Sequence, residues 1–152
     1  MTVTTPLKRA SIERRTVILV TVIVGADQMT KFAAHLGDSS AGFEPVMNPD
    51  YALGLLSGHP VLLSLGMFAA IALVTLWHRR TEYSTTGTWW IVPLFCAGAF
   101  SNLVDRLALG AVRDFVPTPW IVFNLADVAI TLAIAAFYRD LLSPRHRKEV
   151  TP

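Results

Sequence analysis

Carboxylates and carboxamides recur at helical spacing in the second half of the chain, beside apolar sequence. Asn124 and Asp127 lie three residues apart near the start of the last apolar stretch, so a helix there places them on one face. Burial disfavours the charged form of a carboxylate, and a second carboxylate nearby makes the two share one proton. The ionised member of such a pair can activate water while its protonated member acts on a carbonyl. The spacing therefore raises the possibility of aspartate chemistry.

Asp114 is the candidate partner of Asp127, because it precedes the last apolar stretch by a short loop. A solvated loop carboxylate is an equally good interpretation of Asp114 from spacing alone. Asp105 is a weaker candidate, since Arg106 lies beside it and a helix end there would give it a route to solvent. Counted from position 119, Asp127 lies roughly 12 Å into a helix, with nothing in the flanking apolar sequence to neutralise it.

Two further pairs have i,i+4 spacing, which places both members on one helix face. One is Asn102 with Arg106, and the other is Asp27 with Lys31. An ionisable residue inside a membrane span costs about 2.5–3.5 kcal/mol, so each one needs a reason. For Asp27 and Lys31 we favour a self-neutralising pair that also binds a neighbouring helix, with direct chemistry as the alternative. For the segment 101–106 the alternative is an interfacial cap whose charges meet water.

The composition favours a membrane protein. Of 152 residues, 53% are hydrophobic and 16% are charged, whereas a soluble domain carries about 25% charged residues. The net charge of +2 is too small to indicate nucleic-acid binding. The single cysteine, Cys96, excludes an internal disulfide and is interpreted as a packing residue. Scattered histidines argue against zinc, and neither a nucleophilic Gly-x-Ser-x-Gly nor a phosphate-binding glycine loop occurs, so we expect no metal and no cofactor.

The elements that must position these residues are helices long enough to cross a hydrocarbon core of about 30 Å. Four stretches qualify or nearly qualify, at about 16–36, 60–77, 88–103 and 119–138. We expect an all-α membrane protein with four transmembrane helices, forming a single integral membrane domain over 1–152. Asp27 and Lys31 interrupt the first stretch, which favours an uncleaved span over a signal peptide. The connection 37–59 is too long for a turn and predicts a small β-rich platform.

The distribution of charge predicts the orientation. Lys and Arg flank the first stretch on its N-terminal side and the second and fourth on their C-terminal sides, while 37–59 contains neither. The positive-inside rule then places both termini in the cytoplasm and the platform outside. The polar residues of the first, third and fourth stretches, and of the loop before the fourth, then fall near the extracytoplasmic face. Tryptophans at the ends of the stretches fit an interfacial belt: Trp77, Trp89, Trp90 and Trp120.

Four sequence blocks, in this order, resemble the lipoprotein signal peptidases, or signal peptidase II. They are DQMTK at 27–31, NPDYALG at 48–54, GAFSNLVDR at 98–106, and VRDF at 112–115 leading to FNLAD at 123–127. Each block alone is weak evidence. Four in order on a four-span frame make the resemblance specific.

The resemblance implies a bacterial intramembrane aspartyl peptidase of the inner membrane that acts as a monomer without a cofactor. Such enzymes remove the signal peptide of prolipoproteins just before a cysteine that carries a diacylglyceryl group, so lipid-modified prolipoproteins and membrane lipids are the expected partners. By motif position, Asp114 and Asp127 would form the catalytic dyad. The motif residues that would position the substrate are Asn48, Asn102, Arg106 and Asn124. Those that would support the dyad are Asp27, Lys31 and Asp105.

The chain departs from the family pattern in three places. Asp50 and Leu53 stand where the family usually has glycine and phenylalanine, which bears on the shape of the platform. Arg113 precedes Asp114 where an apolar residue is common, and a cation there would lower the pKa of Asp114. The connection between Asp114 and Asn124 is short, so any substrate-facing loop there is reduced.

A different class of function is a small membrane subunit that relays protons or cations through Asp27, Asp114 and Asp127. A relay needs polar groups across the whole membrane. The ionisable residues gather in the outer half instead, and the inner halves of the spans look apolar. The motifs therefore favour the peptidase.

Overall fold

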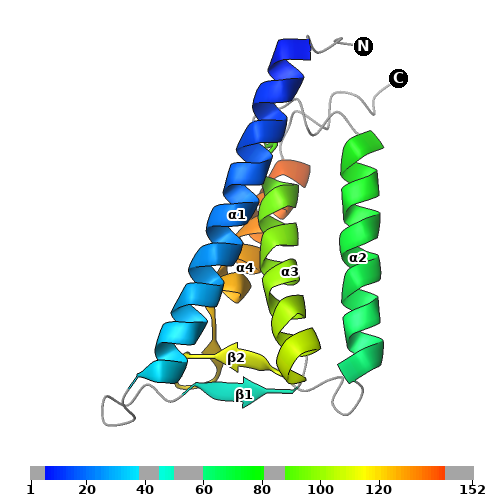
Figure 1. Cartoon of the computed structure of the whole chain (residues 1–152). Helices are drawn as coiled ribbons and strands as arrows, with labels where there is room; N and C mark the ends of the chain where they lie inside the picture. The colour runs from blue at the N-terminus through cyan, green and yellow to red at the C-terminus, as the bar shows by residue number, and fades with distance from the viewer. Residues whose placement is uncertain (1–5, 38–44, 50–59, 81–87, 143–152) are drawn as a thin grey trace.

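The computed structural model describes residues 6–37, 45–49, 60–80 and 88–142 (Figure 1). Within these ranges the chain forms four α-helices: α1 (Pro6–Leu36), α2 (Pro60–Arg80), α3 (Ile91–Leu109) and α4 (Leu125–Leu141). Short strands lie between them: β1 (Val46–Asn48), β2 (Val112–Asp114), β3 (Val116–Pro117) and β4 (Val122–Phe123). The predicted helical stretches are all present, and all four differ from the prediction at one or both ends, α2 only in continuing from 77 to Arg80.

α1 begins at Pro6, ten residues before the predicted start, and so includes the basic flank. Proline is well suited to the first helical position, because it has no N–H to leave unsatisfied and its φ is already helical. α3 continues six residues beyond the predicted end and stops at Gly110, whose φ of 76° is left-handed. The N–H of Gly110 donates to the Arg106 carbonyl, a common way to end a helix.

The longer α3 corrects the prediction for Asp105. The residue lies inside the helix rather than at its end, and it is 1% exposed, so it has no route to solvent. α4 also differs, because it begins at Leu125 and not near 119. Residues 116–123 form the antiparallel pair β3–β4 instead. Asp127 is therefore in the first turn of α4, and the predicted depth of about 12 Å along a helix is wrong.

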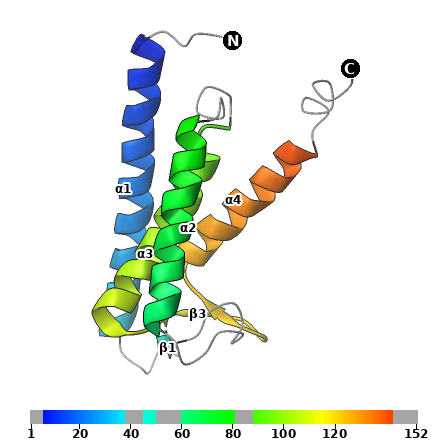
Figure 2. The same ribbon diagram turned by 90° about the vertical axis from the view of Figure 1, so that its right-hand side faces the viewer.

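α1 and α3 run toward the end of the molecule where β1 and β2 lie, and α2 and α4 run back from it (Figures 1 and 2). α3 is central and packs against the other three helices. Away from the strands, α3 and α4 meet through an apolar cluster of Ile91, Leu94, Ala129 and Ala133, which Leu19 and Ile23 of α1 cover. The end with the strands is where the polar side chains are buried.

β1 pairs with β2 in an antiparallel register that sets Val46 opposite Asp114 and Asn48 opposite Val112. This pairing joins the connection between α1 and α2 to the connection between α3 and α4. Within the predicted platform, the described residues 45–49 contain the strand β1. The rest of the platform, with Asp50 and Leu53, lies outside the described residues.

Among the described residues, two helices are long and apolar enough to cross a membrane: α1 over Ala10–Leu36 and α3. Large apolar side chains also lie exposed along the outer faces of the helices, among them Val22, Phe68 and Leu132. Extended apolar surface of this kind suits contact with lipid better than contact with water.

Candidate active site

The close approach of α3 and α4 depends on Gly98. A Cβ at this position would lie 2.5 Å from the carbonyl oxygen of Ala126 and 2.9 Å from Ile130 Cγ1. Because glycine has no side chain, the backbones can approach closely there. One turn further along α3, Asn102 then faces the first turn of α4.

Asn124 and Asp127 hold each other in a capping box at the start of α4. Asn124 Oδ1 accepts a hydrogen bond from the Asp127 N–H at 2.9 Å, and Asp127 Oδ2 accepts one from the Asn124 N–H at 3.2 Å. Two N–H groups that the helix cannot satisfy are paired in this way. These capping partners are uncharged groups, so they hold Asp127 in place without neutralising it.

The side-chain amides of two asparagines link Asp127 to Asp114. Asn102 Nδ2 donates to Asp127 Oδ1 at 2.8 Å, and Asn124 Nδ2 donates to Asp114 Oδ1 at 2.6 Å. The two amides also meet, with Asn124 Nδ2 lying 3.2 Å from Asn102 Oδ1. Hydrogen bonds between neutral amides and carboxylates hold both aspartates at one place without neutralising either. The two aspartates that spacing suggested as partners therefore lie at one site, and their catalytic role stays a prediction.

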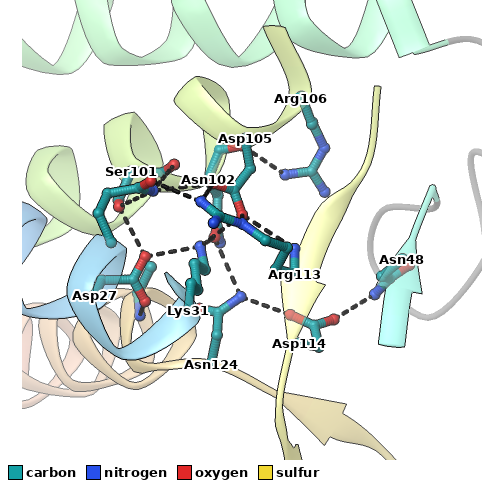
Figure 3. A network of polar contacts seen from close by, with 12 residues as sticks. Asp27, Lys31, Asn48, Ser101, Asn102, Asp105, Arg106, Arg113, Asp114 and Asn124 are labelled. Atoms are coloured by element: carbon teal, nitrogen blue, oxygen red, sulfur yellow. Dashed lines mark hydrogen bonds and ion pairs between the residues drawn. The ribbon is translucent and has the colours of Figure 1, made fainter. Parts of the chain in front are cut away.

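Asn48 completes the surroundings of Asp114 from the β1 strand, where its Nδ2 donates to Asp114 Oδ2 at 2.8 Å (Figure 3). Asp114 is 2% exposed, so it is not the solvated loop carboxylate that spacing alone allowed. Burial raises the pKa of Asp114, the negative charge of Asp127 raises it further, and the hydrogen bonds from Asn48 and Asn124 oppose this shift. Such a carboxyl is suited to keeping a proton beside an ionised partner.

Arg113 does not act on Asp114 as the sequence predicted. Successive residues of a strand point to opposite sides, and the guanidinium of Arg113 lies on the side away from its neighbour. Its Nη2 is 2.7 Å from Asp105 Oδ1 and donates to Gln28 Oε1 at 2.8 Å. The expected lowering of the pKa of Asp114 by Arg113 is therefore wrong.

Asp27 and Lys31 form the expected ion pair, with Lys31 Nζ at 2.7 Å from Asp27 Oδ2 and both side chains fully buried. Asp27 also binds the neighbouring helices, as predicted. Ser101 Oγ donates to its Oδ2 at 2.7 Å, and the Ala126 N–H donates to its Oδ1 at 2.8 Å. The pair therefore fixes α1 to α3 and α4 at the level of the site.

Lys31 also sets the orientation of Asn102. Its Nζ donates to Asn102 Oδ1 at 2.8 Å, which leaves the Nδ2 of that amide to face Asp127. The same ammonium lies 3.3 Å from Asp105 Oδ2. A lysine in this position connects the buried charges of α1 and α3 to the asparagines that bind Asp114 and Asp127.

Two residues of the network were not singled out from the sequence. Gln28 Nε2 donates to Asp105 Oδ1 and to Ser101 Oγ, each at 3.0 Å. Ser101 precedes Asp105 by four residues, so the helical spacing alone was a signal that it shares the buried face. Gln28 had a weaker signal, since it lies beside Asp27 in the first block of the sequence.

Arg106 occupies a different position from the other motif residues. Its Nη1 lies 3.4 Å from the carbonyl oxygen of Asn102, a contact within α3. In Figure 3 its side chain lies beside β2. The role in substrate binding that the motif implies for Arg106 stays a prediction.

A family model described as signal peptidase (SPase) II matches residues 19–143, which is most of the chain. The chain belongs to the signal peptidase II family. This is an aspartic peptidase family, in agreement with a site built around two aspartates. The match includes every predicted site residue.

Individual relatives agree with the family. The lipoprotein signal peptidase of Methylobacterium radiotolerans is 34% identical over 153 residues, covering 87% of this chain and 86% of that protein. The lipoprotein signal peptidase of Thermodesulfovibrio yellowstonii is 35% identical over 139 residues, covering 84% of this chain and 95% of that protein. A solved bacterial membrane enzyme has the same fold, with a TM-score of 0.75 at 19% identity over 91% of this chain and 93% of its own.

The buried polar side chains are also in the wrong place for a relay across a membrane. In the described part of the chain they are Asp27, Lys31, Ser101, Asn102, Asp105, Asp114 and Asn124. All of them belong to the network at the end with the strands, while the opposite half of the α3–α4 contact is the apolar cluster. This arrangement and the membership of the signal peptidase II family both favour the peptidase over the relay.

Proposed function

We propose that Asp114 and Asp127 are the catalytic pair of this signal peptidase II, and that it removes the signal peptide of diacylglyceryl-modified bacterial prolipoproteins. The observation that carries the assignment is the pair of asparagines, Asn102 and Asn124, whose linked amides bind both carboxylates. A solvated or purely structural aspartate would not need two such donors. The cut lies just before the lipidated cysteine.

In the proposed reaction the two carboxyls share one proton. The ionised carboxyl takes a proton from water, whose oxygen attacks the scissile carbonyl carbon, while the protonated carboxyl donates to the carbonyl oxygen. The tetrahedral intermediate then collapses and the C–N bond breaks. The leaving nitrogen takes up the proton that came from the water, and one hydroxyl of the intermediate returns its proton to the other carboxyl as its oxygen becomes the carbonyl of the new carboxylic acid. The two carboxyls end with one proton between them, as they began. Burial and the charge of Asp127 raise the pKa of Asp114, which supports a proton shared between the two carboxyls.

The remaining polar residues hold this pair in place. Asn48 and Asn124 bind Asp114, and Asn102 binds Asp127. We propose that Asn48, Asn102, Asn124 and Arg106 also meet the backbone of the substrate. Asp27, Lys31 and Asp105 support them from α1 and α3.

We propose a single membrane domain over 1–152, with all four helices crossing the bacterial cytoplasmic membrane. α2 has 21 residues and α4 has 17, within the range of about 17–25 residues that a span requires. Basic residues place the start of α1 and the end of α4 in the cytoplasm, so the site lies near the extracytoplasmic face. A signal peptide entering from the lipid would reach the dyad close to the level of its lipidated cysteine. The enzyme acts as a monomer among membrane lipids.

The proposal is tested by cleavage of a diacylglyceryl-modified prolipoprotein by the purified protein in detergent. Wild type is compared with Asp114→Asn and Asp127→Asn, which keep the size of each side chain and remove its acid–base chemistry. Removal of one general acid or base costs about 10²–10⁴-fold in rate, so both variants should fall at least a hundredfold. Glu13→Gln, a change to an exposed carboxylate near the far end of α1, is the matched control.

A second substrate separates peptidase activity from lipid-dependent recognition. The same prolipoprotein without its diacylglyceryl group should be cut far more slowly by wild type. If wild type cuts neither substrate, or if both asparagine variants cut at the wild-type rate, the assignment is wrong. Asp105 would be the next carboxylate to test.

A further inference from the structure

Arg113 binds Asp105 through three donors. Its backbone N–H donates to Asp105 Oδ2 at 3.0 Å, its Nε to the same oxygen at 3.3 Å, and its Nη2 to Oδ1 at 2.7 Å. Asp105 is fully buried, and the Arg113 side chain is largely so. A bidentate arginine–carboxylate pair of this kind fixes both geometry and charge. Strand β2, and with it Asp114, is therefore attached to α3.

Arg113 also balances the charge of the buried network behind the dyad. The network holds two carboxylates, Asp27 and Asp105, and two cations, Lys31 and Arg113, joined by ion pairs. Without the guanidinium, two carboxylates would share one ammonium. An unpaired buried charge is strongly unfavourable, so the remaining ammonium would move toward the carboxylate that had lost its partner.

That movement would reach the dyad through Lys31. The Lys31 ammonium now lies 2.8 Å from Asn102 Oδ1 and 3.3 Å from Asp105 Oδ2. A shift toward Asp105 lengthens its bond to Asn102, the amide that holds Asp127. The same arginine is thus connected to both halves of the site, although its own contacts are to Asp105 and Gln28 (Figure 3). It adjoins Asp114 along β2 and is connected to Asn102 through three successive contacts, by way of Asp105 and Lys31.

We propose that Arg113 is a positioning residue of the peptidase, which neutralises Asp105 so that Lys31 stays bound to Asn102. This inference rests on the proposed roles of Asp114 and Asp127. It does not require Arg113 to touch substrate, because its guanidinium is engaged by Asp105 and Gln28 on the side of β2 away from Asp114.

The inference also predicts a change in pH dependence. The charged groups around the dyad are Asp27 and Lys31 from α1, Asp105 and Arg106 from α3, and Arg113 from β2. Removal of the Arg113 charge makes the net charge of these groups more negative by one unit. A negative charge makes the loss of the shared proton harder, so both limbs of the pH–rate profile should move to higher pH. The expected shift is roughly one pH unit, typical of one nearby unit charge at an effective dielectric constant of about 20.

The experiment measures kcat, KM and the pH–rate profile of Arg113→Met, Arg113→Lys and the double variant Arg113→Met with Asp105→Asn. Arg113→Met should lower kcat about 10–100-fold, because small displacements of catalytic groups have effects of this size, with little change in KM. Arg113→Lys should restore the wild-type pH profile and part of kcat. The double variant should also restore the pH profile, because it removes the unpaired carboxylate. Arg14→Met, at an exposed cation of α1, is the control.

Three results would overturn the inference. A lower unfolding temperature with unchanged kcat and pH profile would give Arg113 a merely structural role. An effect confined to KM would place it against the substrate. A pH shift that persists in Arg113→Lys would exclude charge as the cause. If Arg113→Met does not fold, the Arg113→Lys variant and the double variant still test the inference. The proposed function fails separately, through cleavage by the Asp114→Asn and Asp127→Asn variants.

Discussion

Gly98→Ala tests whether the spacing of α3 and α4 sets the geometry of the dyad. The added Cβ would lie 2.5 Å from the Ala126 carbonyl oxygen, a backbone atom that cannot rotate away. An ordinary contact begins at 3.4 Å, so the helices must separate locally by the difference, 3.4 − 2.5, or about 0.9 Å. The perturbation is a single methyl group outside the polar site.

The magnitude follows from two opposing terms. Overpacking costs about 1–3 kcal/mol, and replacing a helical glycine by alanine returns up to about 1 kcal/mol. Stability should therefore fall by no more than about 3 kcal/mol. The rate should fall as well, because Asn102 lies one turn beyond Gly98 and holds Asp127 at 2.8 Å. A displacement of about 1 Å in such a group can cost about 10²-fold.

The assay pairs initial rates on a diacylglyceryl-modified prolipoprotein with thermal unfolding in the same detergent. Gly25→Ala in α1 and Gly66→Ala in α2 are matched controls, because a Cβ at either position meets nothing within 4 Å. Both should leave cleavage unchanged and raise stability by up to about 1 kcal/mol. A Gly98→Ala variant that cuts at the wild-type rate would refute the argument that this helix contact positions the dyad.

Other predictions concern single side chains of the site and one outside it. Asn124→Ala should abolish cleavage and lower the free energy of unfolding by about 1 kcal/mol through loss of the N-cap. Asn124→Asp should keep the cap and yet be inactive, because it cannot donate to Asp114. Cleavage rates and unfolding temperatures distinguish the two variants. Asn48→Ala removes a donor that lowers the pKa of Asp114, so the alkaline limb of the pH–rate profile should move up. Because the pKa of Asp114 is raised in the folded protein, the stability that its protonated form contributes is lost as the pH rises through that pKa. At pH 7, Asp114→Asn should therefore unfold at no lower temperature than wild type. Trp120 is 89% exposed beside the β3–β4 pair. In a variant that keeps only this tryptophan, its fluorescence should be quenched more by lipids brominated near the headgroup than by lipids brominated near the end of the acyl chain.

Each of these predictions has a contrary outcome. Activity in Asn124→Asp would show that its amide donor is dispensable. An unchanged or lowered alkaline limb in Asn48→Ala would contradict the bond to Asp114. A large drop in the unfolding temperature of Asp114→Asn would mean that the ionised carboxylate stabilises the fold. Deep quenching, or none, would place Trp120 outside the interface.

The residues of the site were predictable because their spacing is a local property. The i,i+4 pair Asp27 and Lys31 and the i,i+3 pair Asn124 and Asp127 face one way in any helix, and both pairs interact in the structure. The apolar stretches likewise predicted the four helices in order. What a helix face touches across the molecule does not follow from spacing.

The errors arose where buried charge resembles a helix end. Asp105 and Arg106 were interpreted as the limit of an apolar span, although Gly110 was a usable signal for the end of α3. The start of α4 was misplaced because β3 and β4 have only two residues each, too short for an alternating pattern. The orientation of Arg113 follows from the pairing of β2 with β1, in which Met47 lies opposite Arg113. The two strands are far apart in the sequence.

The ion pair of Asp27 and Lys31 also bears on how the chain enters the membrane during synthesis. Asn102 follows Lys31 by 71 residues, which at about 5–20 residues per second take roughly 4–14 s to synthesise. In the proposed topology α1 enters the bilayer before its partners on α3 and α4 exist. At an insertion cost of about 2.5–3.5 kcal/mol for each ionised side chain, two isolated charges would oppose that step. The contact of 2.7 Å within α1 pairs them from the outset, so the charges that later support the dyad can cross with the first helix.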